Sequence, residues 1–283
     1  MSNLYTLQGK SEFRGLDLSQ EDIASIIYHD LFDYPLNFGE LIKWKAGRLV
    51  LHSTVNKDAK VSKGFYFIEG REGLVYKRLL RSRISDKKIA IAKRVSKILS
   101  FVPFIKMVGI TGSLAMKNSE ENGDIDLLIV TKKNYLWTTR AITLLTLKFL
   151  GISTRRFGDK NQKDKLCLNM WMDESDLIWK SKNRNVYSAH EIAQIVPTLN
   201  KDKTYEKLLK DNSWIVNFWP NAVKINKKIK KDNKKSKPNF IENFFFDLQY
   251  KYMKKKISRE TVTRTRALFH PLDWAKVVLS RIS

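Results

Sequence analysis

Two apolar stretches joined by a short polar segment constrain the fold of this chain more than any other feature. Residues 105–110 and 125–130 have the length and the aliphatic composition of buried strands. Between them, Gly112 and Ser113 predict a tight turn that leads directly into a helix start at residues 113–117. A buried strand, a turn, a helix start and a second buried strand indicate an α/β (α+β) core with a small mixed sheet flanked by helices.

The segments around this core extend the same pattern. Apolar spacing predicts a long basic helix over residues 71–100, a helix over residues 135–150 and a third strand over residues 166–172. After Asp173 we expect the chain to be helical to its end. The stretch from Lys224 to Lys237 contains eight lysines and a single acid, and we interpret it as a linker or an exposed helix end.

The N-terminal part has a different organisation. Ser19 and Asp22 predict a capping box, and isoleucines at helical spacing follow until Pro35. A second short helix is expected over residues 38–45 and an aromatic-rich strand over residues 64–68. Two helices followed by a hairpin predict a winged-helix-like segment, although no third helix is evident between Gly47 and Lys60. The expected division of the chain is a flexible N-terminus (1–18), a winged-helix-like segment (19–70), the α/β core (71–175) and a helical basic C-terminal region (176–283).

Composition excludes several classes of protein. The 283 residues are 43% hydrophobic, which rules out a disordered chain, and the single cysteine, Cys167, rules out a disulfide scaffold. We therefore expect a reducing, cytoplasmic environment. The most apolar stretch, Ala141 to Ile152, falls short of the roughly 20 residues that span a bilayer, so no membrane association is expected. The 53 Lys and Arg against 29 Asp and Glu give a net charge of +24, which points to a polyanionic partner such as nucleic acid. An AT-rich genome would also enrich lysine without any functional reason.

The polar segment between the two strands carries the residues with chemical potential. Asp124 and Asp126 flank Ile125 at the start of the second strand, so both carboxylates face the same side. An acid beside a buried strand is costly unless a positive group neutralises it. Gly112 and Ser113 offer backbone amides and a hydroxyl to a phosphate group. Paired carboxylates facing a phosphate site suit two magnesium ions and phosphoryl transfer, whereas a solvated turn is the alternative interpretation.

These residues resemble a known family. Gly112-Ser113, a spacer and Asp124-Ile125-Asp126 are similar to the signature of the DNA polymerase β-like nucleotidyltransferase superfamily. More widely, the chain looks like bacterial nucleotidyltransferase-domain proteins with an N-terminal winged-helix-like segment. The segments that carry this wider likeness are residues 31–36, 64–67, 136–140 and 269–273.

The resemblance implies a function for each residue of the motif. Gly112 and Ser113 would contact the triphosphate of an incoming NTP, and Asp124 and Asp126 would bind two Mg²⁺ ions. The superfamily usually adds a third carboxylate from a later strand, as a metal ligand or general base. The activity implied is transfer of a nucleoside monophosphate to an acceptor hydroxyl with release of pyrophosphate.

The third acid is not evident in this sequence. The corresponding strand is residues 166–172, and strand alternation places Cys167, Asn169, Trp171 and Asp173 on one face. Asn169 stands in the middle of that face, where an acid is expected. Either Asp173 or Asp164 supplies the third acid, or Asn169 is a neutral metal ligand, or the site works with two acids or is catalytically weak.

Other residues are weaker candidates. Lys117 and Arg140 are placed where they would reach a phosphate, with a surface ion pair as the alternative for each. His190 falls on an apolar helix face and is interpreted as a structural histidine. Four tryptophans are interpreted as core residues rather than stacking platforms: Trp171, Trp179, Trp214 and Trp219.

Two functions therefore compete. The first is a magnesium-dependent nucleotidyltransferase that uses an NTP and modifies an acceptor hydroxyl, with RNA or tRNA favoured by the charge. The second is a nucleic-acid-binding regulator that keeps the nucleotidyltransferase fold with little turnover. The missing third acid and the winged-helix-like start favour the second.

Overall fold

The computed structural model describes residues 18–47, 58–156, 158–226, 228, 239–255, 257, 260–269 and 274–282. Within these residues it contains nine α-helices, two short 3₁₀-helices and nine strands. The fold is mixed α/β, with one six-stranded sheet and one three-stranded sheet, as the sequence predicts.

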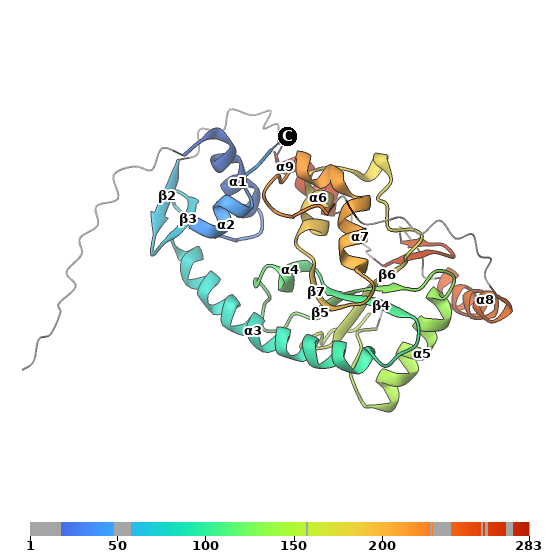
Figure 1. The fold of residues 1–283 in the computed structure, drawn as a ribbon. Helices are drawn as coiled ribbons and strands as arrows, with labels where there is room; N and C mark the ends of the chain where they lie inside the picture. The colour runs from blue at the N-terminus through green and yellow to red at the C-terminus, as the bar shows by residue number, and fades with distance from the viewer. Residues whose placement is uncertain are drawn as a thin grey trace, which may run out of the picture.

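The six-stranded sheet is the centre of the molecule (Figure 1). Its strand order is β7-β4-β5-β6-β9-β8; β5 and β6 are parallel and every other pair is antiparallel. The strands are β4 (Ile105–Ile110), β5 (Ile125–Thr131), β6 (Leu166–Asp173), β7 (Val196–Asn200), β8 (Thr261–Val262) and β9 (Arg266–Leu268). The three strands predicted from apolar runs are therefore confirmed, and they form the interior of the sheet.

Helices cover both faces of this sheet. In Figure 1, α3 (Gly73–Leu99) and α5 (Leu136–Phe149) lie below it, and α6 (Val186–Ala193) and α7 (Thr204–Asp211) lie above it. Each face has its own hydrophobic cluster. The first core cluster, above, includes Leu128, Val130 and Met172, and the second, below, includes Leu127, Ile129 and Trp171. The strict alternation along β5 produces this division.

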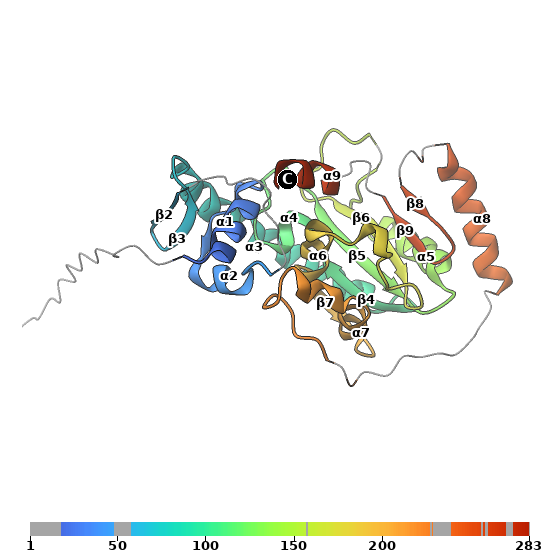
Figure 2. The ribbon, with the colours of Figure 1, turned by 90° about the horizontal axis from the view of Figure 1, so that it is seen from above.

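A carboxylate joins two helices on the lower side. Helix α8 (Phe240–Lys254) packs against α5, as Figure 2 shows, and its Glu242 is buried at the start of α5. The Glu242 carboxylate accepts hydrogen bonds from the backbone amides of Trp137 and Thr138, at 2.8 and 2.9 Å. These amides have no partner within their own helix, so the carboxylate caps α5 and fixes α8 beside it.

The N-terminal part contains α1 (Gln20–Asp30), β1 (Leu36–Asn37), α2 (Phe38–Lys43), β2 (Ala59–Ser62) and β3 (Phe65–Ile68). Ser19 and Asp22 form the capping box that the sequence predicts. The second sheet has the order β1-β3-β2. Residues 1–17 and 48–57 lie outside the described residues, so the flexible N-terminus and the winged-helix-like interpretation of this segment stay predictions.

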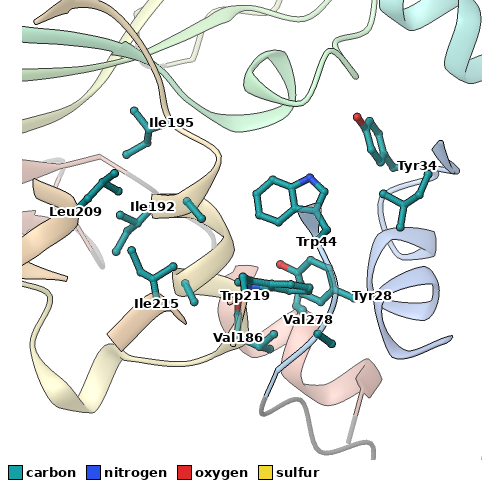
Figure 3. Close-up of a cluster of buried hydrophobic side chains, with 14 of the residues drawn as sticks. Tyr28, Tyr34, Trp44, Val186, Ile192, Ile195, Leu209, Ile215, Trp219 and Val278 are labelled. Atoms are coloured by element: carbon teal, nitrogen blue, oxygen red, sulfur yellow. Dashed lines mark hydrogen bonds between the residues drawn. The ribbon is translucent and has the colours of Figure 1, made fainter. Parts of the chain in front are cut away.

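This N-terminal part shares the first core cluster with residues far along the chain (Figure 3). The Trp44 ring stacks on His190 with centroids 4.1 Å apart, and Tyr28 meets Trp219 edge-on at 4.9 Å. The Gly47 amide donates to the Phe218 carbonyl at 2.7 Å. The two helices before residue 47 are therefore packed against the region that follows β6, with no solvent layer between them.

The prediction that the chain is helical after Asp173 is wrong. Besides α6, α7, α8 and α9 (Trp274–Ile282), this region supplies three strands to the central sheet. β7 contains Pro197, which argues against a strand in a sheet interior, but β7 lies at the edge, where the missing N–H costs no ladder bond. β8 and β9 have two and three residues, too few to show a sequence period. Residues 227 and 229–238 lie outside the described residues, so most of the predicted lysine-rich linker is not described.

No helix among the described residues combines the length and the apolarity that crossing a bilayer requires.

Candidate functional site

The turn between β4 and β5 brings Gly112 against Asp126. The Thr111 amide donates to the Asp126 carbonyl at 3.0 Å, which continues the pairing of the two strands into the turn. Gly112 has φ +61°, and a Cβ at this position would lie 2.8 Å from Oδ2 of Asp126. Only glycine combines this backbone conformation with this close approach. The first residue of the Gly-Ser turn therefore lies directly against Asp126.

The two acids meet a third potential ligand from the next strand. Asp126 pairs with Cys167 across the parallel β5 and β6 strands. One ligand atom from each of Asp124, Asp126 and Cys167 lies within 4.8 Å of the others. This group could hold a metal ion, with both carboxylates partly buried and the cysteine buried.

Burial and mutual repulsion shape the electrostatics of this group. Burial, followed by the negative charge of Asp124, raises the pKa of Asp126 to about 7. Burial, followed by the charges of Asp126 and Asp124, raises the pKa of the Cys167 thiol well above its usual range. Both shifts have one origin, an excess of negative charge in a poorly solvated place. A cation bound between these groups would relieve it.

Arg155 supplies the only countercharge that the described residues place on Asp124. Its Nη1 lies 2.7 Å from Asp124 Oδ2, and the guanidinium is about a third exposed. Arg155 follows α5 in the connection that leads to β6, 31 residues from its partner. No local sequence pattern marks such a long-range pair, so Arg155 was not among the predicted site residues.

Asn169 lies where the third acid was expected. Its Nδ2 donates to Oδ1 of Asp126 at 2.7 Å. Its own Oδ1 is buried and, among the described residues, has no hydrogen-bond partner. Buried amide oxygens are normally satisfied, so this unpartnered atom is available as a ligand.

Asp173 does not join the site, contrary to one of the expectations. It pairs with Thr131, five residues beyond Asp126 on β5, so it lies roughly 16 Å away along the sheet. Its buried carboxylate accepts hydrogen bonds from the amide of Asn134 and from the amide and hydroxyl of Ser175, the latter at 2.7 and 2.6 Å. Asp173 thus organises a turn at the opposite end of the strand.

A β-bulge in β6 explains why the side chains after Asn169 do not face the side that strict strand alternation predicts. Between the pairs Asp126–Cys167 and Leu128–Met170, β6 has one more residue than β5. Asn169 faces Asp126, yet Met170 and Met172 already belong to the first core cluster and Trp171 to the second. An extra residue reverses the facing of everything that follows it. The face shared by Cys167 and Asn169 therefore ends at the bulge.

Two further expectations are also corrected. Asp164, the other proposed source of the third acid, pairs with Lys88 of α3 at 2.8 Å. Lys117, proposed as a phosphate ligand, pairs with Asp86 of α3 at 2.8 Å and does not line the cavity beside the acids. Both side chains are therefore held in ion pairs with α3, and Lys88 is almost fully buried in its pair.

A cavity of about 1320 Å³ is lined by most of the remaining predicted residues, although not by Asp124. Gly112, Ser113, Asp126, Asn169 and Arg140 all contribute to its wall. The cavity extends from the end of α1, past Asp126, to α5 and α8. The structure thus brings Gly112, Ser113, Asp126 and Arg140 to the wall of one cavity.

Glu191 is another carboxylate in the wall of this cavity, one that no sequence pattern marks. It lies on α6 and accepts a hydrogen bond from Gln194 Nε2 at 2.6 Å. Burial, followed by the charge of Asp126, raises its pKa to about 7. Its neighbour His190 is a structural histidine, as predicted, because its ring is stacked on Trp44 and bonded to His29 at 3.1 Å. The four tryptophans are core residues as predicted: Trp171 and Trp219 are fully buried, and Trp179 and Trp214 pack against the first core cluster.

The residues fit a divalent cation. Two carboxylates and an unpartnered buried amide oxygen are hard ligands, whereas the raised pKa keeps the Cys167 sulfur protonated and a weak ligand. No protein-family model and no curated protein matches the chain.

Proposed function

We propose that the chain is a magnesium-dependent nucleotidyltransferase that moves a nucleoside monophosphate from an NTP to an acceptor hydroxyl and releases pyrophosphate. One observation carries the proposal: Gly112 approaches Asp126 so closely that a Cβ would lie 2.8 Å from its carboxylate. The turn that would bind phosphate and the acids that would bind metal are thereby fixed against each other. Phosphoryl transfer needs this proximity, because the cation must touch the phosphate that is transferred.

Asp124 and Asp126 would hold two Mg²⁺ ions, with Asn169 Oδ1 as a neutral third ligand. Bound Mg²⁺ would lower the pKa of the acceptor hydroxyl and would compensate the negative charge of the leaving pyrophosphate. A neutral amide completes the ligand set without adding to the repulsion that already raises the pKa of Asp126. The site therefore works with two carboxylates in this proposal, which is one of the alternatives open from the sequence.

The other residues bind and orient the nucleotide. Ser113 is exposed to the cavity, and with Gly112 it would donate to the triphosphate. Arg155 pairs with Asp124 when the acids have no cation, and a phosphate oxygen would be an alternative partner of the same guanidinium. A charge that can pair with either group keeps the unliganded site close to neutral.

The acceptor class follows from charge. The net charge of +24 and the lysine-rich stretch after Lys224 favour RNA, including tRNA, over an uncharged small molecule. Lysines neutralise phosphates without distinguishing sequences, so affinity for RNA should fall steeply as salt concentration rises.

Transfer of label tests the proposal. The purified protein is incubated with Mg²⁺, each NTP labelled at the α-phosphate, and total RNA. We expect label in the RNA, released pyrophosphate, and loss of both in Asp126→Asn. The matched control is Asp86→Asn, which removes an exposed acid outside the cavity and should leave transfer unchanged. Equal incorporation by Asp126→Asn and the unaltered protein would refute the mechanism.

A nucleic-acid-binding regulator is the second candidate. Asn169 at the position expected for an acid favours it, because an amide cannot act as a general base. Tight RNA binding without incorporation of label and without affinity for any NTP would support the regulator.

A further inference from the structure

Arg140 is a cation without a countercharge in the wall of the cavity. Among the described residues it forms no ion pair, and its Nε is buried with no hydrogen-bond partner. Its Nη1 donates to Gln249 Oε1 at 2.5 Å, and its guanidinium lies over the Phe269 ring at 5.2 Å. An enclosed guanidinium held only by an amide and aromatic rings lacks the anion that such groups normally have.

Hydrogen bonds through Gln249 fix the position of this guanidinium. Gln249 on α8 donates from its Nε2 to the carbonyls of Trp137 and Phe245, at 2.9 and 3.1 Å. With its nitrogen used in this way, Gln249 can offer only its oxygen to Arg140. The orientation of Arg140 is thereby determined by the packing of α8 on α5, and burial lowers the pKa of the guanidinium to about 10.

The surrounding wall carries a second cation from α5, although it also includes Glu260. Arg140, Leu144 and Lys148 recur at every fourth residue of α5, and all three line the cavity. Lys148 also forms no ion pair among the described residues. This end of the cavity thus presents two cations about 12 Å apart along the helix, with an aliphatic side chain between them.

Arg140 is connected to the acids through β6. The Phe269 amide donates to the Asn169 carbonyl at 2.8 Å, and Asn169 Nδ2 is bonded to Asp126. Arg140 and Asp126 therefore line one cavity, and Asn169 is bonded both to Asp126 and to the backbone of Phe269, over whose ring Arg140 lies. A ligand that spans them presents one group to the acids and a negatively charged group to Arg140.

We propose that Arg140, with Lys148, forms a subsite for a phosphate group of the acceptor substrate, separate from the triphosphate site at Gly112 and Ser113. The subsite accepts a phosphate ester, as an acceptor with a phosphodiester backbone would supply. Assigning this subsite to the acceptor substrate rests on the proposed function, whereas the binding of an anion by Arg140 does not.

Titration calorimetry with inorganic phosphate tests the subsite. The protein is first saturated with Mg²⁺ and the non-hydrolysable α,β-methylene analogue of ATP, and phosphate is then titrated. We expect phosphate to bind this complex, and Arg140→Gln to weaken its binding by roughly 10-fold or more. Arg140→Lys, which keeps a charge, should retain part of the affinity. Arg156→Gln, which removes another arginine of the same cavity, is the matched control and should change it little.

The outcomes separate the two proposals. If phosphate and the ATP analogue compete, Arg140 belongs to the nucleotide site and the acceptor subsite is refuted. If Arg140→Gln binds phosphate as well as the unaltered protein, the subsite is also refuted. If the protein binds no nucleotide but binds phosphate through Arg140, the proposed transferase activity is refuted while the anion site is supported.

Thermal unfolding provides a second readout. Because Arg140→Gln removes an enclosed charge that has no countercharge, its melting temperature should be unchanged or raised.

Discussion

Asn169 donates a hydrogen bond from its Nδ2 to Oδ1 of Asp126 across 2.7 Å, and this bond joins β6 to the acid pair of β5. The bond stabilises the charged form of Asp126, although burial and Asp124 together still raise the pKa of Asp126 to about 7. The amide therefore offsets part of the repulsion between the acids without adding a third negative charge.

Replacing this amide by an acid should reverse its effect in the absence of metal. Asn169→Asp adds a carboxylate beside Asp126, so we expect the metal-free protein to lose about 1–3 kcal/mol of stability at neutral pH. Millimolar Mg²⁺ should restore more of the melting temperature in Asn169→Asp than in the unaltered protein. Asn169→Ala, which removes the bond without adding charge, should lose stability with no larger response to Mg²⁺. Equal responses to Mg²⁺ in Asn169→Asp and the unaltered protein would contradict a metal site at this position.

Gly112→Ala should damage the site through backbone strain and a clash. The position has φ +61°, and the new Cβ would press on the Asp126 carboxylate. We expect a loss of about 1–2 kcal/mol in the free energy of unfolding, measured with urea, and loss of nucleotide binding. Gly73→Ala is the control, because Gly73 begins α3 with nothing within 4 Å and has no positive φ. The prediction fails if both variants bind nucleotide like the unaltered protein.

Substitutions of Asp173 and Asp126 should have different effects, because Asp173 has a structural role and Asp126 is proposed to bind metal. Asp173→Asn weakens the bonds that hold Ser175 and Asn134, so the unfolding free energy should fall by about 1.5–3 kcal/mol while affinity for Mg²⁺ stays constant. Asp126→Asn should lose Mg²⁺ affinity and relieve the repulsion with Asp124, with little loss of stability. If the folded Asp173→Asn protein does not bind Mg²⁺, Asp173 contributes to metal binding and this prediction is wrong.

The buried histidine pair should make the fold sensitive to acid. His29 Nδ1 donates to the Ser25 carbonyl at 2.8 Å, which leaves its Nε2 to accept the hydrogen bond from His190. Burial, opposed in part by the bond to Ser25, lowers the pKa of His29 to about 4. Between pH 6.5 and pH 4 the unfolded chain binds a proton that the folded chain excludes, so stability falls as pH falls through this window.

His29 alone should account for about 3 kcal/mol of this loss. Urea unfolding at pH 7, 5.5 and 4.5 measures it, with His29→Asn as the comparison, since asparagine keeps a donor for Ser25. We expect a smaller decline in His29→Asn than in the unaltered protein. If the stability of both proteins falls equally as pH falls, groups other than His29 cause the loss.

The sequence predicts most of the elements because their periods are strong. The aliphatic runs at β4, β5 and β6 and the helical spacing at α1, α3 and α5 need no tertiary information. β7, β8 and β9 were missed because an edge strand tolerates Pro197 and because two or three residues carry no period. Their places are determined by pairing with strands that precede them by many residues.

The site was predictable only where the chain is locally contiguous. Gly112, Asp124 and Asp126 fall in one strand–turn–strand unit, and their spacing alone brings them together. Asp173 was misplaced because it lies six residues beyond Cys167 along β6, and because the bulge between Cys167 and Met170 has no signature in the residues themselves. Arg155 was missed because its partner lies in another element.

The binding of nucleotide in the presence and absence of Mg²⁺ tests the central claim most directly. The α,β-methylene analogue of ATP is titrated calorimetrically into the unaltered protein, Asp126→Asn and Asp173→Asn. The acid pair of Asp124 and Asp126 predicts Mg²⁺-dependent binding in the unaltered protein and in Asp173→Asn, and none in Asp126→Asn. Binding that is the same with and without Mg²⁺, or that survives in Asp126→Asn, would contradict it.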